Sequence, residues 1–145
     1  MIKAKKSLGQ NFLIDINLIN QILETVDINN QSILEIGPGT GNLTKIILKK
    51  NPKKLIVIEK DNELVLFLEK IFGSKIEIIN EDVLKINESL LCKEKLIVFG
   101  NLPYNISTEI LCKWILNINN ENFWFNHLIL MFQKEVADRI IALPN

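Results

Sequence analysis

Short runs of β-branched and other apolar residues alternate with segments of helical period along the chain, and this alternation constrains the fold more than any other feature. Five runs have the length and composition of buried strands: residues 32–37, 54–60, 75–80, 94–101 and 127–133. Four segments have apolar residues at helical spacing: 16–26, 42–50, 62–72 and 107–116, the last with Ser107 as its expected N-cap. Strands that alternate with helices predict an α/β fold, with helices on both faces of a parallel sheet.

The size and composition of the chain fit one globular domain. Its 145 residues are 48% hydrophobic, which is enough for a core. No apolar run approaches the roughly 18 residues of a membrane span, so we expect a cytoplasmic protein without a membrane partner. Cys92 and Cys112 form no CxxC pair and the chain has a single histidine, so we expect two buried cysteine side chains and no metal site.

The charged residues do not by themselves indicate a nucleic-acid partner, because 17 Lys and Arg balance 17 Asp and Glu. The lysines nevertheless gather in two clusters. Lys3, Lys5 and Lys6 form the first, and five lysines within residues 45–54 form the second. Either cluster is able to contact phosphate. A solvated face is the alternative, and it is favoured for the second cluster.

The first predicted strand leads into a glycine-rich loop, EIGPGTGN, at residues 35–42. Gly37, Gly39 and Gly41 predict a tight turn between strand and helix, at which the backbone approaches a ligand. A dinucleotide fingerprint would need a glycine at position 42 or 44, and neither residue is one. The spacing instead resembles the cofactor loop of S-adenosylmethionine-dependent methyltransferases. A glycine-rich turn that binds nothing is the alternative.

Acidic residues follow the next two predicted strands. Glu59 stands 22 residues after Gly37, close to the spacing of about 20 at which an acid meets ribose hydroxyls. A carboxylate suits this role because it accepts hydrogen bonds from two adjacent hydroxyls. Asp82 follows the third strand, where it is placed to accept a hydrogen bond from an adenine amine while Val83 packs on the base. A solvated surface acid is the alternative at both positions.

The fourth predicted strand ends in FGNLPYNIS, residues 99–107. An exocyclic adenine amine is a poor nucleophile because its lone pair is delocalised into the ring. The amide oxygen of Asn101 and the backbone carbonyl of Leu102 would accept its two protons, orient the nitrogen and localise that lone pair. Pro103 fixes the turn without an N–H that competes. Tyr104 offers a flat face on which an extruded base stacks.

Taken together, these motifs identify the chain as similar to the ribosomal RNA adenine N6,N6-dimethyltransferase family, which is related to the Erm methyltransferases. The motifs that carry the resemblance are KKSLGQNFL at 5–13, EIGPGTGNLT at 35–44, VIEKDNEL at 57–64, EDVL at 81–84, NLPYNIS at 101–107 and MFQKEVADRI at 131–140. DNA adenine and protein glutamine methyltransferases share a motif of the N/D-P-P-Y type but lack the GQNFL leader. The resemblance covers essentially the whole chain.

The resemblance implies a fold, a methyl donor and a substrate. The fold would be the Rossmann-like methyltransferase sheet, and the donor would be S-adenosylmethionine. The donor-binding residues would be Asn11, Leu13, Gly37, Glu59, Asp82 and Asn101, with Asn11 and Leu13 in a leader that folds across the cofactor. Asn101 and Tyr104 match the positions that hold the target base. The reaction would be N6,N6-dimethylation of two adjacent adenosines near the 3′ end of small-subunit (16S) rRNA, in the immature 30S particle during ribosome biogenesis.

The chain departs from the family in one large way, by stopping at RIIALPN, residues 139–145. Residues 1–145 would form the methyltransferase domain in incomplete form, without two further strands and the helical C-terminal domain that helps to bind RNA. Strand 127–133 would therefore lie at an open sheet edge, and a separately encoded C-terminal half is an expected partner. Two alternatives remain open: an inactive remnant or cofactor-binding module, and an Erm-type enzyme acting on large-subunit rRNA.

Overall fold

The computed structural model describes residues 4–5, 8–118 and 123–143. Five parallel strands form one sheet in the order β3-β2-β1-β4-β5. They are β1 (Ser32–Ile36), β2 (Lys54–Ile58), β3 (Glu77–Ile79), β4 (Leu96–Asn101) and β5 (Phe125–Met131). Each lies within or beside a run predicted from the sequence, so the predicted parallel α/β sheet is confirmed.

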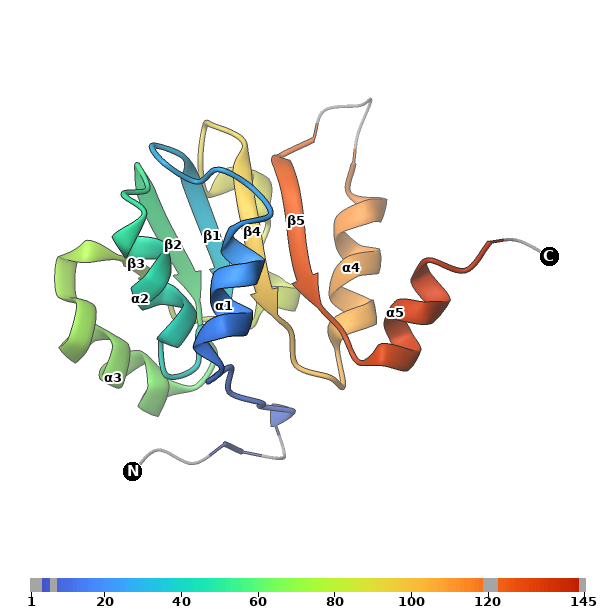
Figure 1. Cartoon of the computed structure of the whole chain (residues 1–145), viewed down its shortest axis with the longest axis horizontal. Coiled ribbons are helices and arrows are strands. Elements are labelled where there is room, and N and C mark those ends of the chain that lie inside the picture. The colour runs from blue at the N-terminus through green and yellow to red at the C-terminus, as the bar shows by residue number, and fades with distance from the viewer. Residues whose placement is uncertain (1–3, 6–7, 119–122, 144–145) are drawn as a thin grey trace.

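In the described part of the chain, helices connect the strands and flank them (Figure 1). They are α1 (Ile16–Leu23), α2 (Asn42–Lys49), α3 (Asn62–Phe72), α4 (Ser107–Leu116) and α5 (Lys134–Ile140). Short 3-10 turns lie between them at Gly73–Lys75, Val83–Lys85 and Glu88–Leu90. Among the residues with described coordinates, no helix has the length and apolar character needed to cross a membrane.

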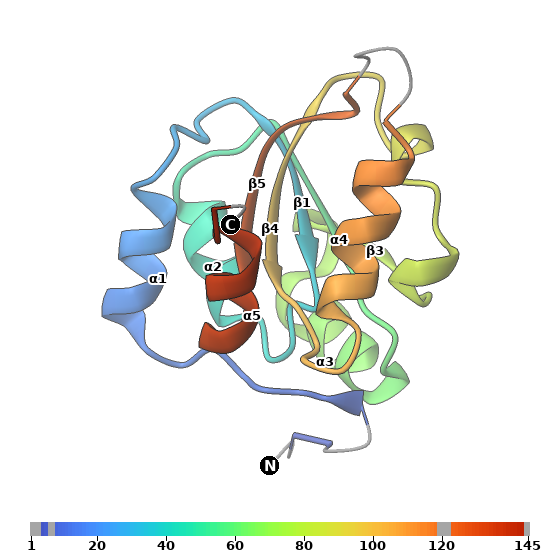
Figure 2. The same cartoon turned by 90° about the vertical axis from the view of Figure 1, so that its right-hand side faces the viewer.

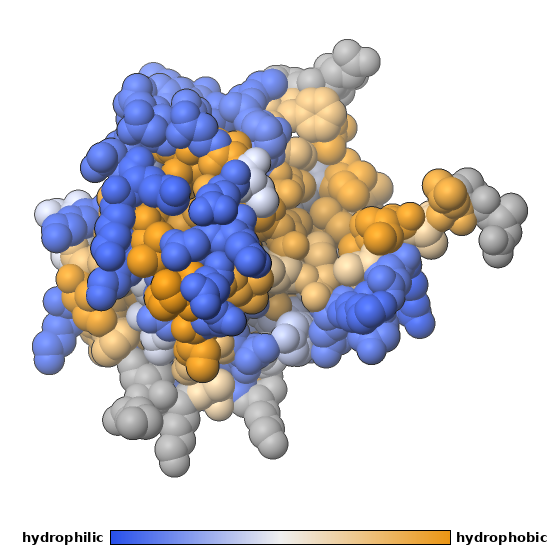
Figure 3. Space-filling view, in the orientation of Figure 1, coloured by the Kyte–Doolittle hydropathy of each residue, from blue (hydrophilic) through white to orange (hydrophobic). Residues whose placement is uncertain are grey.

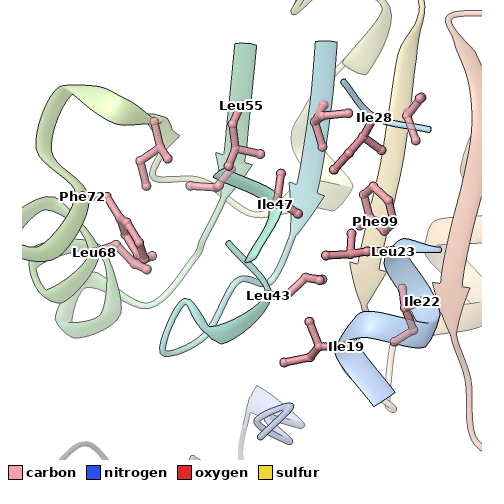
Figure 4. Close-up of a cluster of buried hydrophobic side chains, with 14 residues drawn as sticks. Ile19, Ile22, Leu23, Ile28, Leu43, Ile47, Leu55, Leu68, Phe72 and Phe99 are labelled. Atoms are coloured by element: carbon pink, nitrogen blue, oxygen red, sulfur yellow. The ribbon is translucent and has the colours of Figure 1, made fainter. Parts of the chain in front are cut away.

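Side chains of alternate strand residues enter two separate cores, one on each face of the sheet. On one face, Ile33, Val57 and Phe99 pack against apolar residues of α1, α2 and α3 (Figure 4). On the other, Leu34 and Ile56 pack with the buried side chains of α4. Figure 2 shows the sheet edge-on between these helices. The period of two along each strand therefore explains why both faces are covered, as expected for a parallel sheet.

Three details of the prediction are wrong. Ser107 is not the N-cap of α4. It is the first helical residue, and the preceding Ile106 is the cap, because its backbone already accepts the N–H of Ile110 and donates to the carbonyl of Pro103. The two cysteines are not fully buried. Cys92 is half-buried, and Cys112 is exposed because α4 turns its Trp114 side to the core. The first helix ends at Leu23 rather than residue 26.

One carboxyl group lies inside the first core strand. Glu35 is 2% exposed, and the Thr44 hydroxyl donates a hydrogen bond to its Oε2 at 2.7 Å. Burial raises the pKa of Glu35 to about 8, against the hydrogen bond from Thr44, which lowers it. A buried carboxyl group with one neutral partner is more stable as the acid. Glu35 is thus a source of pH-dependent stability in β1.

We expect the free energy of unfolding to fall as pH rises. The folded-state pKa of Glu35 lies above the 4.5 of a solvated glutamate. The stabilisation that Glu35 provides is therefore complete below its unfolded-state pKa and is lost as pH rises through about 8. Glu35→Gln should flatten this dependence and stabilise the chain at pH 8, by at most about 1.4 kcal/mol for each unit of pKa shift. Urea unfolding between pH 5 and 9 measures both effects. The exposed Glu94→Gln is the control, and equal slopes for wild type and Glu35→Gln would contradict the assignment.

Strand β5 forms one end of the sheet in the described part of the chain, beside β4 alone. Leu128, Ile129 and Leu130 are only partly covered. Figure 3 shows apolar side chains at the surface where β5 lies in Figure 1. A long apolar edge with unpaired N–H and C=O groups favours pairing with other chains.

We therefore expect the 145-residue chain to self-associate through β5. His127→Lys adds charge at an exposed position of this strand, and such charges are a common protection of sheet edges. Sedimentation velocity over a concentration series should show assembly of the wild type and a shift toward monomer for the variant. Asn29→Lys adds the same charge at an exposed position away from the sheet edge and should assemble like the wild type. A wild type that stays monomeric throughout the series would rule out this role of the edge.

Candidate functional site

The carboxyl ends of β1, β2 and β4 meet at one edge of the sheet. Ile36 pairs with Ile58 on one side and with Gly100 on the other. The residues that follow these three are Gly37, Glu59 and Asn101. Parallel register therefore brings together three predicted site residues that are up to 64 positions apart in the chain.

A cavity opens at this edge, with about 880 Å³ of empty space including its open mouth. Most of the predicted cofactor residues line it: Asn11, Gly37, Glu59, Asp82 and Asn101. The sixth, Leu13, instead lines a small adjoining hollow and packs against the core. Tyr104 lines neither space and is 40% exposed, although its neighbours Pro103 and Asn105 line the cavity.

The glycine loop has the backbone conformation that glycine permits. Gly37 and Gly39 have φ values of +65° and +59°, a region that other residues rarely adopt. The Gly37 N–H also donates to the Ile58 carbonyl at 3.0 Å, which joins the loop to the end of β2. A Cβ atom at Gly39 would lie 2.9 Å from the Phe12 ring. A side chain at this position would therefore push the leader, defined here as residues 8–13, away from the loop.

Glu59 is 7% exposed, and its Oε1 accepts the backbone N–H of Asp61 at 2.9 Å. Burial raises the pKa of Glu59, and hydrogen bonds from the backbone of Asp61 and Gly39 oppose the shift. Two segments of the site, the glycine loop and the start of α3, thus hold the same carboxyl group. This fixes its direction before any ligand arrives.

Asp82 stands at the end of the loop that follows β3. Its Oδ1 accepts the Leu84 N–H at 3.0 Å, and its Oδ2 accepts the Lys60 ammonium group at 2.7 Å. The hydrogen bond from Lys60 is the main cause that lowers the pKa of Asp82, with burial acting against it. Asp82 is therefore an ionised acceptor on the wall of the cavity, beside Val83.

A buried polar group holds this loop against α4. The Lys113 ammonium group donates to the Val83 carbonyl at 2.6 Å and to the two Glu88 carboxylate oxygens at 2.8 and 3.0 Å. The Trp114 indole N–H donates to the same carboxylate at 2.8 Å. Glu88 is 3% exposed, so the pair is largely removed from water and both charges have partners.

The leader crosses the carboxyl ends of the strands, below the sheet in Figures 1 and 2. The Asn101 side-chain amide donates to the backbone carbonyl of Asn11. The Asn11 amide in turn donates to the Tyr104 hydroxyl at 2.5 Å. Asn42 donates to the Leu13 carbonyl at 2.9 Å. The leader thus contacts both the glycine loop and the motif at the end of β4.

The two lysine clusters differ in how they are engaged. Lys5 pairs with Asp61 and Glu63 beside the cavity, while Lys3 and Lys6 fall outside the described residues. In the second cluster, Lys53 pairs with Glu94 and Lys54 with Glu77 on the surface. No group of three potential metal-ligating side chains occurs within the described ranges.

Sequence reasoning missed several residues of the site. Gln10, Lys60, Leu84 and Asn105 also line the cavity. Lys60 follows Glu59 and Leu84 follows Val83. Proximity to the ends of the second and third predicted strands was therefore the available signal. Asn105 lies in the NLPYNIS motif beside Tyr104, so the motif was its signal. Gln10 adjoins Asn11 in the leader, and strand-end spacing gives no signal for it, because only the folded leader brings it to the site.

Comparison with known proteins agrees with this geometry. Residues 1–145 match the family described as ribosomal RNA adenine dimethylase. The chain is 64% identical over 141 residues to ribosomal RNA small subunit methyltransferase A of Pelagibacter ubique, covering 97% of this chain and 53% of that protein. It is 49% identical to the protein of the same name from Ehrlichia ruminantium, covering 100% and 55%.

Solved structures show the same relationship. A dimethyladenosine transferase from Plasmodium falciparum superposes with a TM-score of 0.76 at 31% identity, over 92% of this chain and 47% of that one. The 23S rRNA methyltransferase ErmE superposes with a TM-score of 0.69 at 29% identity, over 88% and 50%. The chain spans about half the length of the curated relatives it matches. On the family match over its whole length and on these relatives, the chain belongs to the ribosomal RNA adenine dimethylase family.

Proposed function

We propose that this chain is the donor-binding and base-binding part of an enzyme that dimethylates N6 of two adjacent adenosines in small-subunit rRNA, with S-adenosylmethionine as methyl donor. The observation that carries the proposal is the single cavity that Gly37, Glu59, Asp82 and Asn101 line together at the carboxyl edge of the sheet. These residues come from four different strand ends, and family membership supports their assignment to one ligand.

The residues of the cavity fit a nucleoside-like donor. Glu59 is a buried acceptor suited to two ribose hydroxyls, and Asp82 is an ionised acceptor suited to an adenine amine. Val83 and Leu84 supply apolar contact for the base. Gly37 lets the backbone come close to the remaining part of the ligand.

The base-binding role rests on the orientation of one amide. Asn101 donates its N–H to the Asn11 carbonyl, so its oxygen remains available to accept a proton of the target amine. The Leu102 carbonyl is the second proposed acceptor, and Tyr104 is the proposed stacking face. A bound donor supplies an electrophilic methyl group, so Asn101 needs to position the amine rather than remove its proton.

The proposed partners follow from the relatives. Small-subunit rRNA within an immature 30S particle is the proposed substrate, which places the chain in the cytoplasm. The relatives are small subunit methyltransferases A by name, which favours this substrate over large-subunit rRNA. Residues 1–145 form the methyltransferase domain in this proposal. The length that the relatives have in addition would supply further RNA contacts, from the same chain or from a separately encoded half.

Glu59→Ala should weaken S-adenosylmethionine binding. Loss of a hydrogen bond to a charged group costs about 1.5–3 kcal/mol, which is roughly ten- to a hundredfold in affinity. Isothermal titration calorimetry on the 145-residue chain measures the change. Glu77→Ala, which removes an exposed glutamate of β3, is the matched control and should bind like the wild type. Equal affinities for wild type and Glu59→Ala would exclude the ribose assignment.

Asn101→Ala should lower turnover more than donor affinity. Removing a hydrogen bond made in the transition state lowers turnover by about a hundredfold or more. Single-turnover methylation of unmodified 30S particles is the assay, with the chain extended to the length of its relatives. Asn29→Ala, at an exposed position, is the control.

Near-normal turnover by Asn101→Ala would mean that NLPY is only a turn. The same assay separates the two substrates. Methylation of unmodified large-subunit particles but not of 30S particles would favour the Erm-type alternative and overturn the proposed substrate.

A further inference from the structure

Asp61 connects the leader to the start of α3. The Lys5 ammonium group donates a hydrogen bond to its Oδ1 at 3.0 Å and lies 2.9 Å from its Oδ2. The Gln10 side-chain amide donates to Oδ2 of Asp61 at 3.1 Å. Its Oδ1 accepts the backbone N–H of Glu63 at 3.0 Å, as the N-cap of α3. The Asp61 side chain is 5% exposed, whereas that of Lys5 is 39% exposed. A buried carboxylate therefore binds two side chains from the N-terminal segment.

The two partners of Asp61, Lys5 and Gln10, also bind each other. The Gln10 side-chain oxygen accepts the backbone N–H of Lys5 at 2.8 Å, and the Leu8 N–H donates to the Lys5 carbonyl at 3.0 Å. Lys5, Gln10 and Asp61 thus form a closed ring of contacts. Burial raises the pKa of Asp61, but hydrogen bonds from Lys5, Gln10 and the Glu63 backbone outweigh it and lower that pKa. The ring is consequently held with Asp61 ionised.

Asn11, which follows Gln10, contacts the two residues of the proposed base site. The Asn11 carbonyl accepts the Asn101 amide, and the Asn11 side chain donates to Tyr104. A side-chain amide carries its NH₂ group and its oxygen on opposite sides. When the Asn11 carbonyl accepts the Asn101 N–H, the Asn101 oxygen is therefore turned away from Asn11. The orientation of Asn101 therefore depends on where the leader lies.

We propose that Asp61 is a positioning residue: by holding Lys5 and Gln10 it keeps the leader across the cavity, and so keeps the Asn101 amide turned with its oxygen toward the substrate. The consequence for methyl transfer rests on the proposed function. The anchoring itself does not. Asp61 also joins the two halves of the site, because its backbone N–H holds Glu59 while its side chain holds the leader.

Asp61→Asn separates anchoring from helix capping. Asparagine caps a helix about as well as aspartate, but it has no charge for Lys5, and its N–H₂ group competes with that of Gln10. Asp15→Asn is the matched control. Asp15 caps α1 through the N–H groups of Asn17 and Leu18 at an exposed position, and no ion pair of Asp15 occurs among the described residues.

Solution NMR of the 145-residue chain tests the anchoring without any ligand. In Asp61→Asn we expect backbone order parameters for the leader to fall from about 0.85 toward 0.6 or below, and the Asn101 side-chain amide resonance to shift. Asp15→Asn should change neither. Lys5→Met should act in the same direction as Asp61→Asn, and the double variant should add little. A purely structural role in α3 would change thermal stability but leave the leader and the Asn101 amide unchanged, and that outcome would overturn the proposal.

Calorimetry with S-adenosylhomocysteine adds the functional measurement. If the leader covers the ligand, its affinity should fall about tenfold in Asp61→Asn and remain within twofold in Asp15→Asn. Unchanged affinity together with a loosened leader would overturn the claim that the anchor serves the site. A wild type that binds no ligand would instead count against the proposed function, and the NMR result alone would then decide the anchoring.

Discussion

Parallel pairing of β1 with both β2 and β4 is the constraint on which the site depends. Ile36 is the register partner of Ile58 and of Gly100. The residues that follow these three therefore lie at the same edge of the sheet. No hydrogen bond between the site residues is needed to bring them together. Side chains that alternate into two cores hold the register, since a slip by one residue would move every apolar side chain into the opposite core, away from its packing partners.

Buried polar groups then set the directions of the side chains at this edge. Glu35, Glu59, Asp61 and Glu88 are each less than 10% exposed, and each accepts at least one hydrogen bond. Among the described residues no buried side-chain nitrogen or oxygen lacks a partner. Removing such groups from water is unfavourable unless they are paired. The resulting hydrogen-bond networks therefore allow few alternative side-chain orientations, and they fix the walls of the cavity in advance.

The leader adds the remaining wall. It is the part of the site that is joined mostly by side-chain hydrogen bonds rather than by a strand ladder, at Asp61, Asn101 and Tyr104. Contacts of this kind open at a lower free energy than a paired core strand.

The sequence by itself determined the alternation of strands and helices, the glycine loop and the acids at the strand ends, because side-chain period and turn chemistry are local properties. It also placed Glu59, which directly follows β2, and Asp82, which stands three residues after β3. The resemblance to a family, and not spacing, indicated Asn11 and Leu13. Only the tertiary structure decided that Asp61 anchors the leader, that Tyr104 lies outside the cavity, and that Ser107 does not cap α4. These features depend on contacts between segments as far apart as Asn11 and Tyr104, and no local pattern encodes which distant partner a polar side chain will meet.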